Sequence, residues 1–256
     1  MKIRLILGTA LIGVLDPAFT APRMEVQHID GLVLLQSLKP LTDIKKGEFE
    51  KTPDFNKRVC DATNRALNVP ADRVVTIAAP LNSEYDIADR YSADKEMFIF
   101  HIKGGIMGSS KESFEDQWKW KNFDPFTANR YLSNAPIAHL YREAPVKYTG
   151  KTVHGISKEV RVASEERLGL FYSARAYEIK LAMKASEAQK LKGDLRVIFS
   201  ARLSSPCFFW GTKHTSPKVD NPYDRTITAY GLVASSIEWI VVRAKTMEIV
   251  KRGVLK

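Results

Sequence analysis

Residues 195–203 (LRVIFSARL) form the strongest predicted strand of the chain, because apolar and β-branched residues fill most of the run. Just before it, residues 185–192 are predicted to form a short helix that Gly193 closes in the C′ position. Residues 206–222 begin and end with proline and are predicted as a loop, and residues 226–242 contain one or two further strands. This part of the chain is therefore rich in strands.

Strand-like runs also precede this region. Residues 152–162 and 169–183 contain β-type runs, and the charged stretch 164–167 (SEER) between them is predicted as an exposed turn. Residues 96–103 (EMFIFHIK) form another predicted strand, and the apolar run 32–35 (LVLL) is a candidate strand near the start. The strands come in groups and do not alternate regularly with helices, which favours antiparallel pairing over a doubly wound fold.

One longer helix is expected near the N-terminus. Thr52 can act as its N-cap, Pro53 suits the first helical position, and Pro70 ends the segment. Apolar residues follow at spacings of four, three and four: Phe55, Val59, Ala62 and Ala66. We therefore predict a single α+β domain over residues 22–256, a mainly antiparallel sheet with this N-terminal helix and the second short helix packed on it.

The first residues resemble a secretory signal peptide. Lys2 and Arg4 precede an apolar run over residues 5–15, and small residues follow near Ala21. The run is too short to span a membrane, which needs about 20 apolar residues. We therefore predict a signal peptide over residues 1–21, with Thr20 a better last residue than Ala21, and a periplasmic or secreted chain without a transmembrane span. A buried N-terminal strand or helix is the alternative.

The composition is that of an ordinary globular protein with an excess of positive charge. The 256 residues are 45% hydrophobic and 27% charged, with a formal net charge of +10. Such a charge favours anionic partners, which for an exported protein are envelope polymers and lipid headgroups. Nucleic acid is not the expected partner of an exported chain. The alternative is a solvated basic face without a specific partner.

The chain has two cysteines, Cys60 and Cys207. In an oxidising compartment such a pair is a candidate disulfide. Two separate buried thiols are the alternative, because free cysteine is often buried.

Catalytic signatures are absent from the sequence. There is no His-Glu-x-x-His, no Cys-x-x-Cys and no Gly-x-Ser-x-Gly motif, and the five histidines have no metal-ligand spacing. Residues 104–111 (GGIMGSSK) resemble a phosphate-binding loop, but two serines separate the last glycine from the lysine, so the register is wrong. We therefore assign no catalytic residue, no metal site and no cofactor from the sequence.

Residues 114–126 (FEDQWKWKNFDPF) are the most unusual stretch, because aromatic and cationic residues alternate there. Aromatic faces beside cations can stack on sugars or bases and pair with anionic groups. The candidate binding surface consists of Trp118, Lys119, Trp120, Lys121 and Phe123. The alternative is that these rings attach a long loop to the sheet.

Several short motifs resemble a group of secreted proteobacterial proteins of unknown function. They are residues 47–52 (GEFEKT), 91–95 (YSADK), 191–196 (LKGDLR), 221–223 (NPY), 237–241 (IEWIV) and 246–249 (TMEI). The chain departs from that pattern at Met247, where the family favours glycine, and at residues 152–155. The resemblance covers roughly residues 47–250. It implies a small exported α+β protein and supplies no catalytic residues.

Together these observations favour an exported binding or accessory protein for an anionic envelope partner. An envelope hydrolase with a site assembled from distant residues is the second hypothesis, and a secreted effector is the third.

Overall fold

The computed structural model describes residues 29–68, 75–78, 87–102, 119–121, 133–151, 155–172 and 178–255. The predicted signal peptide lies outside the described residues. The elements are β1 (Ile29–Asp30), α1 (Gly31–Leu38), the 3-10 helix η1 (Lys39–Asp43), α2 (Thr52–Ala66), β2 (Val75–Ala78), β3 (Ile87–Ser92), β4 (Met97–Ile102), β5 (Lys119–Lys121), β6 (Ser133–Lys151), β7 (Ser157–Tyr172), β8 (Glu178–Ala182), α3 (Ala185–Leu191), β9 (Leu195–Thr215), β10 (Tyr223–Arg243) and β11 (Ile249–Val254).

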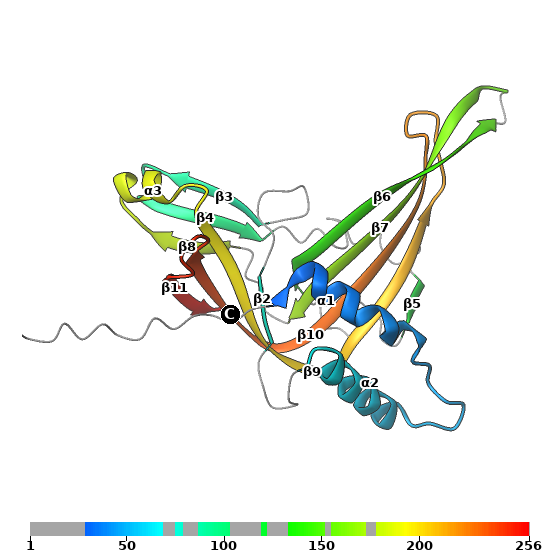
Figure 1. Ribbon diagram of the computed structural model, residues 1–256, viewed down its shortest axis with the longest axis horizontal. Helices are drawn as coiled ribbons and strands as arrows, with labels where there is room; N and C mark the ends of the chain where they lie inside the picture. Colours follow the sequence, from blue (N-terminus) through cyan, green and yellow to red (C-terminus); the bar gives the residue numbers. More distant parts are fainter. Residues whose placement is uncertain are drawn as a thin grey trace, which may run out of the picture.

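The strands form one large and one small sheet (Figure 1). The eight-stranded sheet has the order β1-β2-β9-β10-β7-β6, with β11 added to β10 and β5 added to β9. The three-stranded sheet has the order β3-β4-β8. The long strands β9 and β10 run through both arms of a V-shaped molecule, and the small sheet and α3 lie on the arm that also holds β11 (Figure 1).

The α+β prediction is wrong. Strands make up 60% of the residues that the structure describes and helices 20%, so the fold is β-rich, and the large sheet is mixed and not mainly antiparallel. The parallel pairing of β7 with β10 has a simple cause. The β6–β7 and β9–β10 hairpins lie side by side, and the return strand of each runs inward from its own tip, so the two neighbouring return strands point the same way.

The strands of these hairpins are longer than the sequence indicates. The predicted turn at residues 164–167 lies within β7, and the first half of the predicted loop at residues 206–222 belongs to β9. Pro206 is accommodated close to an irregular part of the β9–β10 ladder, where the register shifts between Leu232 and Ser236. Charged residues and a proline therefore do not interrupt these strands.

Both predicted helices are present, and one predicted strand is a helix. The α2 helix begins at Thr52 and buries Phe55, Val59 and Ala62, although Lys51 and not Thr52 occupies the N-cap. The α3 helix ends before Gly193, whose φ of 79° is the left-handed conformation expected of a C′ glycine. The apolar run 32–35 lies in α1, because the side chain of Asp30 accepts hydrogen bonds from the backbone N–H groups of Leu32 and Val33.

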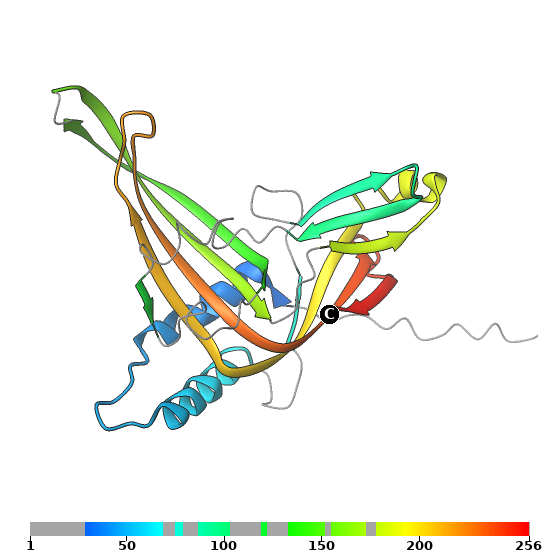
Figure 2. The same cartoon turned by 180° about the vertical axis from the view of Figure 1, so that it is seen from behind.

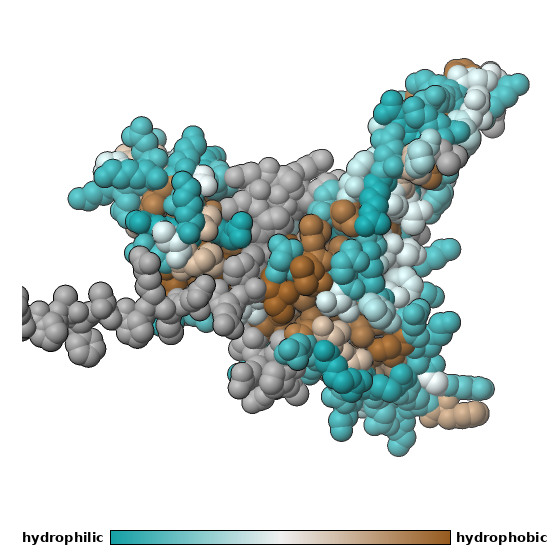
Figure 3. Space-filling model, in the orientation of Figure 1, coloured by the Kyte–Doolittle hydropathy of each residue, from teal (hydrophilic) through white to brown (hydrophobic). Residues whose placement is uncertain are grey.

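The helices α1 and α2 cover one face of the large sheet (Figure 1). The buried leucines of α1 and the buried apolar side chains of α2 pack with side chains of β7, β9 and β10 in the main hydrophobic core. This core includes Leu34, Leu35, Leu38, Phe55, Val59, Leu168, Leu170, Phe208 and Leu232. At the start of α1, Leu32 and Val33 remain 47% and 59% exposed. Figure 3 shows hydrophobic side chains gathered in the region of α1 on this face.

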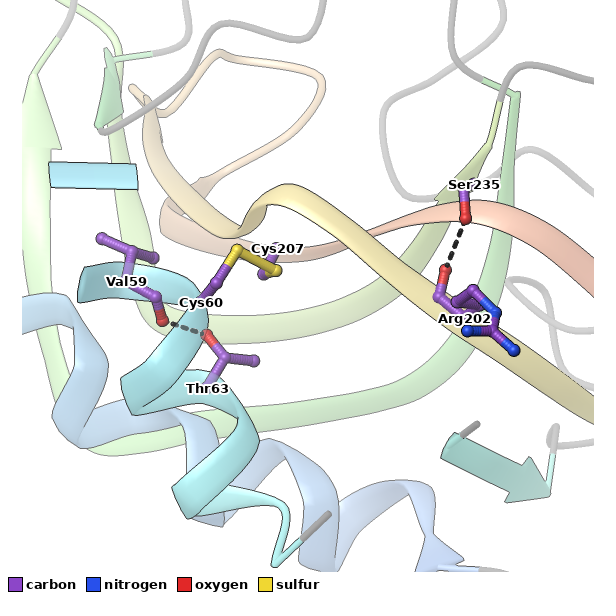
Figure 4. Close-up of a disulfide and its surroundings, with 6 residues drawn as sticks. All are labelled: Val59, Cys60, Thr63, Arg202, Cys207 and Ser235. Carbon is purple, nitrogen blue, oxygen red and sulfur yellow. Dashed lines mark hydrogen bonds between the residues drawn. A yellow bond between two sulfur atoms is a disulfide. The ribbon is translucent and has the colours of Figure 1, made fainter. Parts of the chain in front are cut away.

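A disulfide joins α2 to β9. Cys60 and Cys207 are bonded, with their Cα atoms 5.0 Å apart and 147 positions between them in the sequence. Figure 4 shows Cys60 reaching from the helix to Cys207 on the strand. One turn along the helix, the Thr63 hydroxyl donates a hydrogen bond of 2.8 Å to the Val59 carbonyl. The candidate disulfide is thus present, and it fixes the helix to the sheet.

Candidate functional site

The face of the large sheet opposite α1 and η1 carries a cluster of charged side chains. Alternation along β7 separates the two faces: Glu166 turns toward η1, where it pairs with Lys39 at 2.7 Å, and Glu165 and Arg167 turn the other way. Figure 2 views the sheet from this opposite side, with α1 behind the strands. We call the cluster on this side the Glu165 cluster; its members are His139, Glu165, Arg167, Lys213 and Arg225.

The register of the strands brings these five residues together. Tyr141, Glu165, Ile227 and Lys213 form one row across β6, β7, β10 and β9. The next row toward the centre of the sheet contains His139, Arg167, Ala229 and Gly211, followed by Trp120 of β5. Arg225 lies two positions before Ile227 on β10 and therefore on the same face. Residues up to 86 positions apart in the sequence thus meet on one surface.

Glu165 is the centre of the cluster. It is only 1% exposed, and its Oε1 atom lies 2.7 Å from His139 Nε2 and 2.5 Å from Arg167 Nε. Its other oxygen, Oε2, accepts no hydrogen bond from the described residues, but Arg225 Nη1 lies 3.4 Å away. One buried carboxylate therefore faces cationic or titratable groups from three strands.

These contacts hold Glu165 in the ionised form. Burial by itself raises the pKa of the carboxyl group, but hydrogen bonds from His139 and Arg167 and the charge of Arg167 outweigh burial and lower the pKa to about 2. An ionised carboxylate only accepts hydrogen bonds, so the Nε2 atom of His139 carries a proton and donates it to Glu165. The carboxylate thereby fixes the tautomer and the orientation of the imidazole.

Lys213 is the cation of the cluster that lacks a counter-ion. No hydrogen bond or ion pair joins its ammonium group to any residue that the structure describes, although the side chain is half-buried. Burial lowers the pKa of Lys213, and the charges of Arg167 and Arg225 lower it further. Because Ile227 separates it from Glu165 in the row, the carboxylate does not neutralise it. Two arginines thus share the carboxylate of Glu165, and the third cation of the cluster, Lys213, is left without an ion pair to the described residues.

The cluster is accessible from one side. Tyr141, opposite Glu165 on β6, is 44% exposed, and the side chain of Arg225 is 31% exposed. An excess of positive charge at a partly buried, partly open place suits an anionic group, since charge-assisted hydrogen bonds from arginine and lysine are the usual means of binding carboxylates and phosphates. The arrangement can therefore bind an anion.

The aromatic stretch predicted from the sequence borders the same face. Trp120 lies opposite Gly211 and contacts Phe209 edge-to-face, with ring centroids 5.5 Å apart. A Cβ atom on Gly211 would lie 2.4 Å from the Trp120 ring, so only glycine allows this approach. Of the predicted binding surface, Lys119 and Lys121 are exposed and Trp120 is half-buried, and Trp118 and Phe123 lie outside the described residues.

Two more aromatic side chains, Phe209 and Phe171, follow Trp120 on the same face of the sheet. Phe171 and Phe209 meet edge-to-face at 4.8 Å on either side of Gly231, where a Cβ atom would lie 2.3 Å from the Phe209 ring. Both rings are fully buried. The face opposite α1 is thus apolar and aromatic at its inner end and charged farther out.

Sequence reasoning missed the Glu165 cluster, because its members have no regular spacing in the chain. The available signal was the absence of glycine, proline and asparagine from residues 156–172 apart from Gly169, which argues against a turn at residues 164–167. Glu165 and Arg167 are charged residues two positions apart, so in a strand they lie on the same face. Such a pair within a strand that extends in both directions indicates a polar or functional face. The predicted aromatic segment, in contrast, does reach the edge of this face through Trp120.

The remaining histidines form simpler pairs. His101 lies 3.2 Å from Glu178, and His214 lies 3.4 Å from Asp224, while His28 and His154 lie outside the described residues. In the part of the chain that the structure describes, no group of three or more His, Cys, Asp or Glu residues could hold a metal ion. The helices of that part are all too short or too polar to cross a membrane.

Comparisons of the chain with protein family models, with curated proteins and with solved structures found no match.

Proposed function

We propose that the protein is an exported accessory protein that binds an anionic component of the cell envelope through the Glu165 cluster. The single observation that carries this proposal is the excess of cationic side chains in the cluster: Arg167, Lys213 and Arg225 against one carboxylate, with no counter-ion for Lys213 among the described residues. An anionic ligand that replaces the missing counter-ion would gain charge-assisted hydrogen bonds in a place partly shielded from water.

Three further observations support the exported location and the choice of partner. The Cys60–Cys207 disulfide is compatible with an oxidising compartment, in keeping with the signal peptide expected from the sequence. The formal net charge of +10 speeds encounter with anionic surfaces. The aromatic ring of Trp120 beside the cluster adds an apolar surface on which a sugar or another flat group could rest.

Retention of the full chain on isolated envelope fractions tests this function. We expect retention at low salt that high salt reverses, because salt screens exposed charges. The double variant Lys213→Gln/Arg225→Gln should lose retention, and the matched variant Lys119→Gln/Lys121→Gln, which removes the same charge from nearby exposed positions, should keep most of it. Equal losses in the two variants would show that net charge alone governs binding, and equal retention of all three proteins would refute the proposal.

A second function, envelope hydrolase, is favoured by the contact between His139 and Glu165. A histidine that a buried carboxylate orients at 2.7 Å is the arrangement of a general base in many hydrolases. His139→Ala should then abolish hydrolysis of envelope polymers by the full chain, and retention on envelope fractions measured in parallel separates a loss of hydrolysis from a loss of binding. Absence of any hydrolysis by the unmodified chain would exclude this second function.

A further inference from the structure

Lys213 offers a chemistry beyond reversible anion binding. We propose that the Lys213 amine forms an imine with a small aldehyde or ketone that carries a carboxylate or phosphate group. The inference rests on the proposed function for the anion, which the arginines of the Glu165 cluster would hold, and adds a covalent step at the lysine.

The position of Lys213 suits a nucleophile. Its neighbour across the ladder is Ile227, a buried apolar residue, and the carboxylate of Glu165 lies beyond Ile227 in the same row. Lys213 therefore lies beside an apolar residue and on the same face as two guanidinium groups, and no carboxylate among the described residues pairs with its charged form. Desolvation and neighbouring cations are the two conditions that make a lysine amine nucleophilic near neutral pH.

The charges around Lys213 support the same conclusion. Burial and the nearby Arg167 and Arg225 all lower the pKa of its ammonium group, so a larger share of neutral amine is present at neutral pH. Other titratable groups on this face of the described strands are His139 and Glu165, which pair with each other, and Tyr141 at the end of the row. Farther toward the hairpin tips, the same face carries Glu143, Arg161 and Tyr223.

The step balances without any other reagent. The neutral amine attacks the carbonyl carbon and forms a C–N bond, the carbonyl oxygen takes a proton, and the nitrogen loses one, which gives a carbinolamine. Loss of that hydroxyl group as water, with the second proton of the nitrogen, leaves the C=N bond. Arg225, which is partly exposed and 3.4 Å from Glu165, is placed to hold the anionic group of the incoming molecule.

Labelling of the full chain with pyridoxal phosphate tests the inference, because this aldehyde carries a phosphate. Borohydride reduces the imine to a stable secondary amine, and peptide mass spectrometry locates it. We expect Lys213 to be labelled faster at neutral pH than the exposed Lys119 and Lys121, and inorganic phosphate to slow the reaction at Lys213 alone. This comparison within one protein requires no variant that could fail to fold.

A second probe separates the covalent step from anion binding. Arg225→Gln removes one of the charges that lower the pKa of Lys213, so it should slow labelling by 5-deoxypyridoxal, which lacks the phosphate. With pyridoxal phosphate the same variant should be slowed several-fold more, because the phosphate also loses its contact with Arg225. If Lys213 reacts no faster than Lys119 and Lys121 while pyridoxal phosphate still binds reversibly, the imine is refuted and the proposed function stands. If pyridoxal phosphate does not bind at all, both are refuted.

Discussion

The carboxylate of Glu165 determines how the side chains of three strands are arranged. It accepts hydrogen bonds from His139 and Arg167 and faces Arg225, and it does so while almost completely buried. A buried charge is tolerated only where partners of opposite charge and hydrogen bonds compensate for the loss of water. Removing the carboxylate would take the Glu165 ion pair away from Arg167, which is itself buried.

Substitution Glu165→Gln should therefore destabilise the protein by about 3 kcal/mol at neutral pH. Urea unfolding at pH 7 measures the loss. The control is Glu159→Gln on the same strand, because Glu159 is 61% exposed and its pair with Lys147 should contribute less than about 1 kcal/mol. Equal losses for the two variants would contradict a structural role for the buried carboxylate.

The same residue predicts how stability depends on acid. Its pKa is about 2 in the folded protein, below the ordinary value of 4.5, so its contribution is complete above about pH 4.5 and is lost as the pH falls toward 2. Unfolding followed over this range should show a steeper loss of stability for the unmodified chain than for Glu165→Gln. Parallel curves would show that other carboxyl groups cause the acid sensitivity.

The backbone conformation of Glu96 lowers the stability of the folded state. Glu96 ends the turn between β3 and β4 with a φ of 44°, its side chain is exposed, and its backbone carbonyl accepts a hydrogen bond of 2.9 Å from the Met183 N–H group. A left-handed residue with a Cβ atom costs about 1–2 kcal/mol, part of which glycine recovers. Glu96→Gly should raise the free energy of unfolding by about 0.5–1 kcal/mol in urea titrations, whereas Asp94→Gly in the same turn should lower it.

At the scale of single elements, β5 depends on one glycine. The strand has three residues, and Trp120 at its centre lies against Gly211 of β9. Gly211→Ala should cost about 1–3 kcal/mol, because the new methyl group would overlap the Trp120 ring. Gly47→Ala, where the nearest atom lies at 3.5 Å, is the control and should change stability little. If Gly211→Ala is as stable as the control, the packing of Trp120 on β9 is not required for stability.

The elements that the sequence predicts correctly are those with local signals. Pro53 and a regular apolar stripe mark α2, and Gly193 marks the end of α3. The short apolar run 32–35 has no such signal of its own, and Asp30 as N-cap makes it a helix. The charged residues 164–167 resemble a turn in isolation, but the ladders on both sides keep them in β7.

The candidate site could be predicted only in part for the same reason. Trp120 is noticeable in a local stretch of aromatic and cationic residues, so composition alone points to it. Lys213 and Arg225 meet Glu165 through the register of β7, β9 and β10, which depends on how two distant hairpins pair. Local patterns contain no information on that pairing, and neither the parallel contact nor the cluster follows from them.

On the scale of the whole molecule, the edge strand β6 of the large sheet has features that hinder pairing with another chain. β6 ends the order of the described strands and is 19 residues long, so it exposes a long row of backbone groups. Pro136 and Pro145 lie at or within the two register shifts of its ladder with β7. Prolines and bulges at such places prevent edge-to-edge pairing with another chain.

The disulfide joins the helical layer to the sheet, so its loss should affect the entire fold. Cys60 and Cys207 close a loop across 147 positions, which on the chain-entropy model stabilises the folded state by about 5 kcal/mol. Cys60→Ala/Cys207→Ala should lower the free energy of unfolding by an amount of this order, and a reducing agent should shift the urea midpoint of the unmodified chain but not that of the variant. Thiol titration of the denatured, unreduced chain should find no free cysteine. Two free thiols, or equal midpoints with and without reductant, would show that α2 is held to β9 by packing alone.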